Sequence, residues 1–152
     1  MNATVSQNKI LEFYYIAPNK EKFSLNGNPI AGFPSFMANG KIICQFWDFY
    51  LSLAAKYVGI YKTDNFGDMP QNDSALRKSL SDYYYYDNNI EPYMVFNLNF
   101  SYQIIELPYL WNLKLFCQIN NLFNERFATG AEGKEFFPAA ERNIFIGTEI
   151  LF

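Results

Sequence analysis

Strict alternation of apolar and polar residues is the feature that most constrains this chain. Between Met94 and Ile104 the even positions are Met, Phe, Leu, Phe, Tyr and Ile, while the odd positions are Val, Asn, Asn, Ser and Gln. Successive side chains of a β-strand point to opposite faces, whereas an amphipathic helix repeats its apolar residues every three or four positions. This segment therefore predicts a long strand with one apolar face and one polar face.

The same alternation recurs along the chain and predicts an all-β fold. Further strands are expected over Phe36 to Phe46, Phe49 to Tyr61, Leu113 to Ile119 and Ile144 to Phe152, with a weaker candidate over Ala3 to Ile16. A short helix is expected over residues 75–80, because Asn72, Asp73 and Ser74 are residues that cap helix N-termini. We expect about six antiparallel strands in total.

The connections between these strands alternate in length. Trp47-Asp48 and the segment 106–109 are short, whereas 19–34, 63–92 and 123–141 are long and polar. Transmembrane β-barrels combine short periplasmic turns at one end with longer extracellular loops at the other. The spacing therefore favours an antiparallel up-and-down transmembrane β-barrel.

The residues on the two strand faces support a lipid-facing apolar side. The polar positions carry Asn, Ser, Gln and isolated Lys, which suit a hydrated lumen. Aromatic residues gather near the strand ends, as in the girdles of membrane barrels; they are Phe36, Phe46, Phe49, Tyr57, Tyr61, Tyr102 and Phe152. Six strands do not close a barrel, because single-chain bacterial barrels have at least about eight.

Two alternatives therefore stay open beside an open part of a larger barrel. One is a small self-standing outer-membrane protein, structural or adhesive, that closes by oligomerisation. The other is a soluble β-sandwich that presents tyrosines to a carbohydrate.

Composition argues against several other classes of function. The 152 residues include no histidine, which excludes catalytic triads and His-ligated metal sites, and nothing nominates a catalytic group, a metal site or a cofactor. A net charge of −3 does not supply the cationic surface that binds nucleic acid. Cys44 and Cys117 lack metal-ligand spacing and are expected to act as small apolar residues. No signal peptide is recognisable after Met1.

The C-terminal third resembles the end of the TonB-dependent outer-membrane receptors. The resemblance lies in the run Asn121-Leu122-Phe123-Asn124 after the penultimate strand, in Pro138 followed by Arg142-Asn143 before the last strand, and in the terminal aromatic Phe152. Weaker similarity to the preceding hairpin covers Gly27 to Pro34 and Lys56 to Asn65. These motif residues are interpreted as structural, because Asn and Pro are suited to positions where a strand ends in a loop.

This resemblance implies a roughly 22-stranded plugged barrel that imports ferric siderophores, cobalamin or similar nutrients across the outer membrane of a Gram-negative bacterium. Residues 1–152 would supply the last six strands, an open partial barrel without a plug domain, and would not transport alone. The implied partners are outer-membrane lipid, the barrel-assembly machinery, and the remaining barrel and plug.

Two further groups of residues are candidates for function. The alternating C-terminal residues Ile146, Ile150 and Phe152 resemble the signal that the barrel-assembly machinery recognises, and they would equally suit a lipid-facing strand. Tyr83, Tyr84, Tyr85 and Tyr86 lie in the longest loop and could stack on a ligand, although tyrosines also gather at the headgroup level of membranes.

Overall fold

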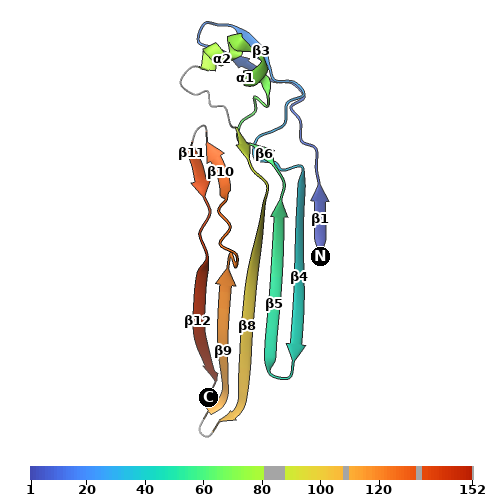
Figure 1. The fold of residues 1–152 in the computed structure, drawn as a ribbon. Coiled ribbons are helices and arrows are strands. Elements are labelled where there is room, and N and C mark those ends of the chain that lie inside the picture. Colours follow the sequence, from blue (N-terminus) through green and yellow to red (C-terminus); the bar gives the residue numbers. More distant parts are fainter. Residues whose placement is uncertain (81–87, 108–109, 133–134, 152) are drawn as a thin grey trace.

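The chain forms one antiparallel sheet of six strands in the computed structural model, which describes residues 1–80, 88–107, 110–132 and 135–151. The strand order is β1-β4-β5-β8-β9-β12 (Figure 1). The strands are β1 (Asn2–Val5), β4 (Phe36–Phe46), β5 (Phe49–Val58), β8 (Tyr93–Leu107), β9 (Leu110–Asn120) and β12 (Asn143–Leu151). Within the described part of the chain, β1 and β12 are the two edges, so the sheet is open.

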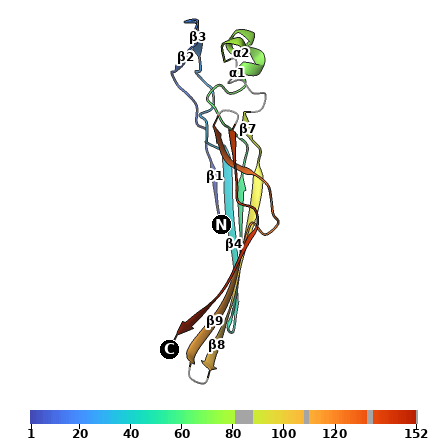
Figure 2. The same cartoon turned by 90° about the vertical axis from the view of Figure 1, so that its left-hand side faces the viewer.

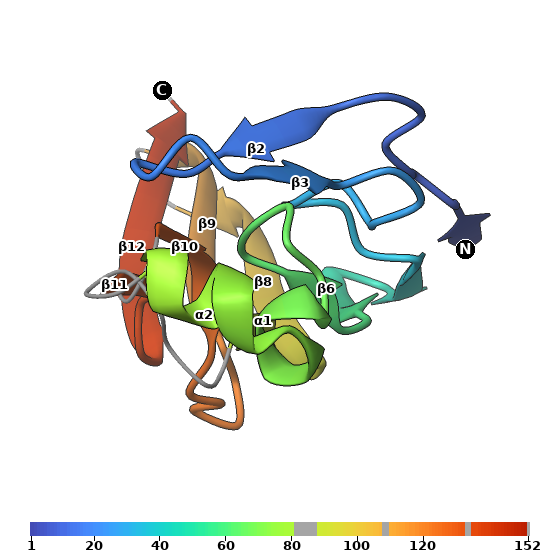
Figure 3. The ribbon, with the colours of Figure 1, turned by 90° about the horizontal axis from the view of Figure 1, so that it is seen from above.

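The two ends of the sheet differ, as the loop lengths predict. At one end, which we call the turn end, Trp47 and Asp48 join β4 to β5, and residues 108 and 109 join β8 to β9. At the other, the loop end, lie the long connections with their own short elements (Figures 1 and 3). These are β2 (Tyr14–Ile16), β3 (Lys22–Ser24), β6 (Tyr61–Lys62), α1 (Met69–Asn72), α2 (Ser74–Leu80), β7 (Asn89–Ile90), β10 (Ala128–Glu132) and β11 (Glu135–Pro138).

The strand register aligns most apolar residues of the long strands on one face, which we call the apolar face. One row across five strands is Ile42, Leu53, Leu98, Ile119 and Ile144. The next row is Cys44, Leu51, Phe100, Cys117 and Ile146. The opposite, polar face carries rows such as Ser52, Asn99 and Gln118. The period of two in the sequence thus becomes a two-faced sheet.

The apolar face is exposed, and the buried core lies elsewhere. Figure 2 shows the six strands as a single twisted layer, and Ile42 and Ile146 are 66% and 81% exposed. The buried apolar residues that the structure describes lie at the loop end; they are Ala17, Phe23, Leu25, Val58, Leu76, Leu80, Ile90 and Tyr93. No second layer covers the apolar rows of the described strands.

The sequence-based strand limits are confirmed for β4 and hold to within a few residues for β5, β8, β9 and β12. The expected helix over 75–80 is α2, and Oδ1 of Asp73 accepts hydrogen bonds from the backbone amides of Ala75 and Leu76. The candidate strand from Ala3 to Ile16 is wrong as one element. Its start pairs with β4, whereas its end forms a separate hairpin with β3 at the loop end.

Candidate functional site

The loop end is the candidate functional site, because the long connections and the buried core meet there. The tyrosines proposed for ligand contact, Tyr83 to Tyr86, lie outside the described residues. Their flanks are placed: Leu80 at the end of α2 and Asn88 before β7 are both buried. Both described flanks of this segment therefore lie in the loop end.

A small apolar core joins two of the long loops. Leu76 and Leu80 of α2 pack against Ala17 and Phe23, which belong to the β2–β3 hairpin and its turn. The ring of Tyr15 lies edge-on to Phe66 at a centroid distance of 5.2 Å, and it is stacked on Phe23 at 6.3 Å. These contacts fix α2 beside the hairpin, although about 50 residues of sequence separate Phe23 from Leu76.

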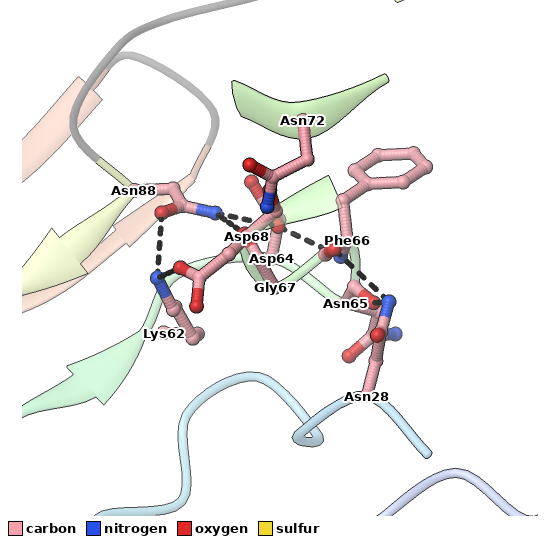
Figure 4. A network of polar contacts seen from close by, with 9 residues as sticks. All are labelled: Asn28, Lys62, Asp64, Asn65, Phe66, Gly67, Asp68, Asn72 and Asn88. Carbon is pink, nitrogen blue, oxygen red and sulfur yellow. Dashed lines mark hydrogen bonds and ion pairs between the residues drawn. The ribbon is translucent and has the colours of Figure 1, made fainter. Parts of the chain in front are cut away.

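A polar network connects the same loops from the other side (Figure 4). Asn88, only 2% exposed, donates from Nδ2 to Oδ1 of Asp64 and to the carbonyl oxygen of Gly67, at 3.1 and 2.8 Å. Its Oδ1 accepts from Nζ of Lys62 at 3.1 Å, and Lys62 also forms an ion pair of 2.6 Å with Asp68. The buried amide is thereby satisfied on both sides, as burial of a polar group requires.

Asn28 extends this network to the first long loop. Its Nδ2 lies 3.0 Å from the carbonyl oxygens of both Asn65 and Phe66. The backbone amide of Ala31 donates to Oδ1 of Asn65 at 2.8 Å. Gly67 adopts a positive φ of 59°, and a side chain there would approach Cδ of Pro29 within 3.3 Å. The turn at 64–68 therefore depends on a glycine and on amide side chains from two other segments.

The Asn121 to Asn124 run forms a compact turn after β9. Asn121 has a φ of 54° and is 4% exposed, and its side chain bonds the backbone amide of Glu125 and the carbonyl oxygens of Glu125 and Ala140. The amide of Leu122 donates to the carbonyl oxygen of Phe96, and the ring of Phe123 lies edge-on to Phe96 at 5.1 Å. Asparagine tolerates the left-handed region because its short amide bonds the local backbone.

The Pro138 to Asn143 segment completes this turn from the other strand. Pro138 is the last residue of β11 and is followed by residues 139–142 outside any strand. Oδ1 of Asn124 accepts the backbone amide of Arg142 at 2.8 Å, and the side chains of Asn120 and Asn143 are hydrogen-bonded at 2.9 Å. The asparagines of the motif thus bond nearby backbone atoms and one another, and the structural role expected for the motif stays a prediction.

The β10–β11 hairpin is held against the polar face of the sheet. The ring of Phe127 stacks on Tyr93 at 4.1 Å, and Val58, Ile90, Val95 and Ala131 pack around them. The hydroxyl of Tyr61 donates to the carbonyl oxygen of Thr129 at 3.0 Å. Partial burial raises the pKa of Tyr61, and the nearby Tyr93 raises it further. Tyr61 was expected in the aromatic girdle and instead anchors this hairpin.

The polar face below the loop end is hollowed. One depression of about 700 Å³ is lined by Lys41, Tyr50, Ser52, Asn99, Phe100, Ser101, Gln103, Lys114, Phe116, Cys117, Gln118 and Glu149. Half of these residues carry uncharged hydrogen-bonding side chains, as expected of a lumen wall. In the described part of the chain no three His, Cys, Asp or Glu residues cluster as metal ligands would, and no helix there could cross a membrane.

The candidate assembly residues lie on the terminal strand. Ile146 and Ile150 both belong to β12 and face the same way as the apolar rows of the sheet. Phe152 lies outside the described residues. Because β12 is an edge of the described sheet, its outer side carries no strand partner.

These features define the class of fold: a curved section of β-barrel wall, with turns at one end, long loops at the other, an apolar outer face and a hollowed polar face. Comparison with solved structures confirms this assignment. The siderophore receptor PiuA from Acinetobacter baumannii matches with a TM-score of 0.62 and 14% identity over 89% of this chain. The ferric-catecholate import receptor Fiu from Escherichia coli K12 matches with a TM-score of 0.53 and 17% identity over 84%.

The chain spans 16% of the length of each of these receptors. No family model and no curated protein sequence matches the chain. The shared property is therefore the fold, an open six-stranded antiparallel sheet that matches part of the barrel wall of these proteins.

Proposed function

We propose that this chain is the C-terminal, six-stranded part of the barrel of a TonB-dependent outer-membrane receptor. The observation that carries the proposal is the exposed apolar face, whose rows run across five strands without any covering layer among the described residues. In water such a surface would be costly, at about 25 cal/mol for each Å² of apolar area. Hydrocarbon is the solvent that removes this cost.

The dimensions of the apolar face suit a bilayer. Phe36 and Phe46 lie at the two ends of the 11-residue strand β4. At about 3.3 Å per residue this distance is roughly 33 Å, and a strand tilted by about 40° then spans about 25 Å of membrane. Phe46 stacks on Trp47 at the turn end, and Phe36 contacts Tyr57 at the other. These aromatic pairs would form the two girdles, and the loop end would face the outside of the cell.

The ligand of the intact receptor is proposed to be a ferric siderophore, cobalamin or a nutrient of similar scarcity. The loop end would form part of the enclosure around it, with Tyr83 to Tyr86 as candidate contacts. PiuA and Fiu are described as siderophore and ferric-catecholate receptors, which favours an iron chelate over the other ligands. Energised import would require the remaining strands and a plug in addition to this chain.

Lipid and the assembly machinery are the proposed partners of the barrel part. Ile146, Ile150 and Phe152 would form the signal by which the machinery recognises the terminal strand. The two open edges, β1 and β12, would pair with the remaining strands of the barrel. Each unpaired backbone group in hydrocarbon costs several kcal/mol, so pairing of these two edges would stabilise the sheet in a membrane.

Adjacent residues on β4 allow a direct test of the membrane proposal. Ile42 lies on the apolar face and Lys41 on the polar face that lines the hollow. With Cys44 and Cys117 changed to serine, we would attach a nitroxide to Ile42→Cys or Lys41→Cys in the chain reconstituted in lipid bilayers. We expect oxygen dissolved in lipid to relax the label at 42, and a water-soluble nickel chelate to relax the label at 41. Equal access of the chelate to both positions would contradict the proposal.

A further inference from the structure

The polar face of β12 contains one position without a side chain, Gly147, and the ring of Phe116 occupies the space above it. A Cβ built on Gly147 would lie 2.4 Å from Cζ of Phe116 and 2.9 Å from its Cε1. These distances are shorter than real Cβ contacts, so any larger residue at 147 would displace the ring. The two residues are direct cross-strand partners of β9 and β12.

This contact is notable because, apart from the turn that Asn124 and Arg142 help to form before the strand and the Asn120–Asn143 contact at its start, little along β12 specifies how it pairs. The strand is an edge of the described sheet, and residues 121–142 separate it from β9, so no tight turn sets its register. Its own alternation is imperfect, since Phe145 shares the polar face with Asn143, Gly147 and Glu149. If β12 shifted by two residues along β9, each of its side chains would stay on the same face of the sheet. The apolar pattern alone would therefore not oppose such a shift.

A shift of two residues would, however, break the fit at Phe116. The ring would then oppose Phe145, which is also aromatic, or the carboxylate of Glu149. Only Gly147 offers room on this face of the strand for a ring that crosses from β9. The ion pair of 3.3 Å between Lys114 and Glu149 is the next polar-face contact, but it is exposed and contributes little.

We propose that Phe116 and Gly147 set the register of the terminal strand, and so determine where along its open edge each residue of β12 lies. An aromatic ring over a glycine on the neighbouring strand is a known means of stabilising such a site. The proposal concerns pairing within this chain and is independent of the ligand and of the membrane location. It can therefore fail while the proposed function stands, and the reverse also holds.

The native Cys117 provides a reporter of this register, since Ile146 lies directly opposite it. With Cys44 replaced by serine, single cysteines would be placed by Ile144→Cys, Ile146→Cys and Thr148→Cys in the full chain folded in detergent. Directly opposed Cβ atoms are about 5 Å apart and diagonal ones about 7 to 8 Å, beyond easy reach of a disulfide. We expect oxidation to join Cys117 to position 146 about tenfold faster than to 144 or 148.

The contact between Phe116 and Gly147 is then disrupted by substituting either residue. In Phe116→Ala, Phe116→Leu and Gly147→Ala we expect the preference for position 146 to fall about fivefold, the upper range of one cross-strand pair. Lys114→Gln removes a neighbouring polar-face side chain and should leave the preference unchanged. Complete loss of cross-linking in Phe116→Ala, with normal cross-linking in Lys114→Gln, would also support the proposal, because β12 would have detached.

Two outcomes would overturn it. One is a parent chain without a preference for position 146. The other is an unchanged preference in all three variants at Phe116 and Gly147, which would assign the register to the Asn120–Asn143 contact and the turn that precedes it.

Discussion

The backbone amide of Asn121 donates to Oδ1 of Asn97 at 2.9 Å, and this bond joins the end of β9 to the polar face of β8. The same asparagine then turns the chain through a positive φ and bonds both Glu125 and Ala140 with its side chain. One residue thereby connects two strands and both ends of the third long loop.

Substitutions at Asn121 should follow a defined order of stability. Asn121→Gly keeps the backbone conformation but loses the side-chain bonds, at a cost of about 1 to 3 kcal/mol. Asn121→Ala adds about 1 kcal/mol because alanine disfavours the left-handed region. Asn121→Asp places a carboxylate beside two carbonyl oxygens and should be at least as damaging as alanine. Urea unfolding of the chain in detergent measures this series, and an alanine variant as stable as glycine would contradict it.

Replacement of Asn88 should loosen the loop network without unfolding the sheet. Asn88→Ala leaves Lys62 and the carbonyl oxygen of Gly67 each without one partner, which costs about 1 to 3 kcal/mol. We expect faster amide hydrogen exchange in residues 62–72 and unchanged exchange in β4 and β5. Asn72→Ala, which removes one exposed bond to the carbonyl oxygen of Asp68, is the matched control. Equal exchange in both variants would show that the network does not order this loop.

An arginine substitution should impair membrane insertion more on the apolar face of β8 than on its polar face. Leu98 and Asn99 are neighbours in sequence but lie on the apolar and polar faces respectively. Leu98→Arg would place a charge in hydrocarbon, at about 2 to 4 kcal/mol near the bilayer centre. Asn99→Arg would point into the hollow and should cost much less. Insertion of each variant into lipid vesicles provides the measurement. Similar insertion of the two would argue against a lipid-facing apolar side.

The anchoring of the β10–β11 hairpin should depend on pH through Tyr61. Its hydroxyl must be protonated to donate to Thr129, and the folded-state pKa is raised above the ordinary value. The stabilisation is therefore complete below about pH 10, the unfolded pKa, and is lost as the pH rises through the higher folded value. A nitroxide on Glu135→Cys in β11 should become more mobile over that range.

The variant Tyr61→Phe serves as the control for this titration, because it lacks the hydroxyl at every pH. We expect its label at position 135 to be mobile already at pH 8 and to change little above it. A parent chain whose label is equally mobile at pH 8 would show that the hydroxyl bond does not hold the hairpin.

The strands of the sheet could be predicted from the sequence, whereas the packing at the loop end could not, for a physical reason. Alternation of apolar and polar residues indicates that a strand has one apolar face, so the limits of β4 could be predicted. It does not indicate whether lipid or another part of the protein covers that face. Phe23 lies between the polar residues Lys22 and Ser24 like a membrane-facing residue, yet it packs against α2. Tyr61 is a residue type common in aromatic girdles, but its hydroxyl donates a hydrogen bond to the carbonyl oxygen of Thr129.

The polar network was beyond prediction because its members are far apart in sequence. Lys62, Asp64 and Asn88 are ordinary loop residues taken singly, and only the folded chain brings them around Gly67. The short run Asn121 to Asn124 was different. Its asparagines act on nearby backbone, so their local role could be inferred from residue type alone.

The packing of Leu76 against Phe23 has a consequence for how this fold diversifies. Two loops that share one buried core cannot change shape separately, because a longer or differently folded first loop would leave α2 without its support. Exchanging only one of them between related barrels, as an engineer or a recombination event would do, should yield an ill-ordered loop end. The two loops would therefore be inherited as a pair.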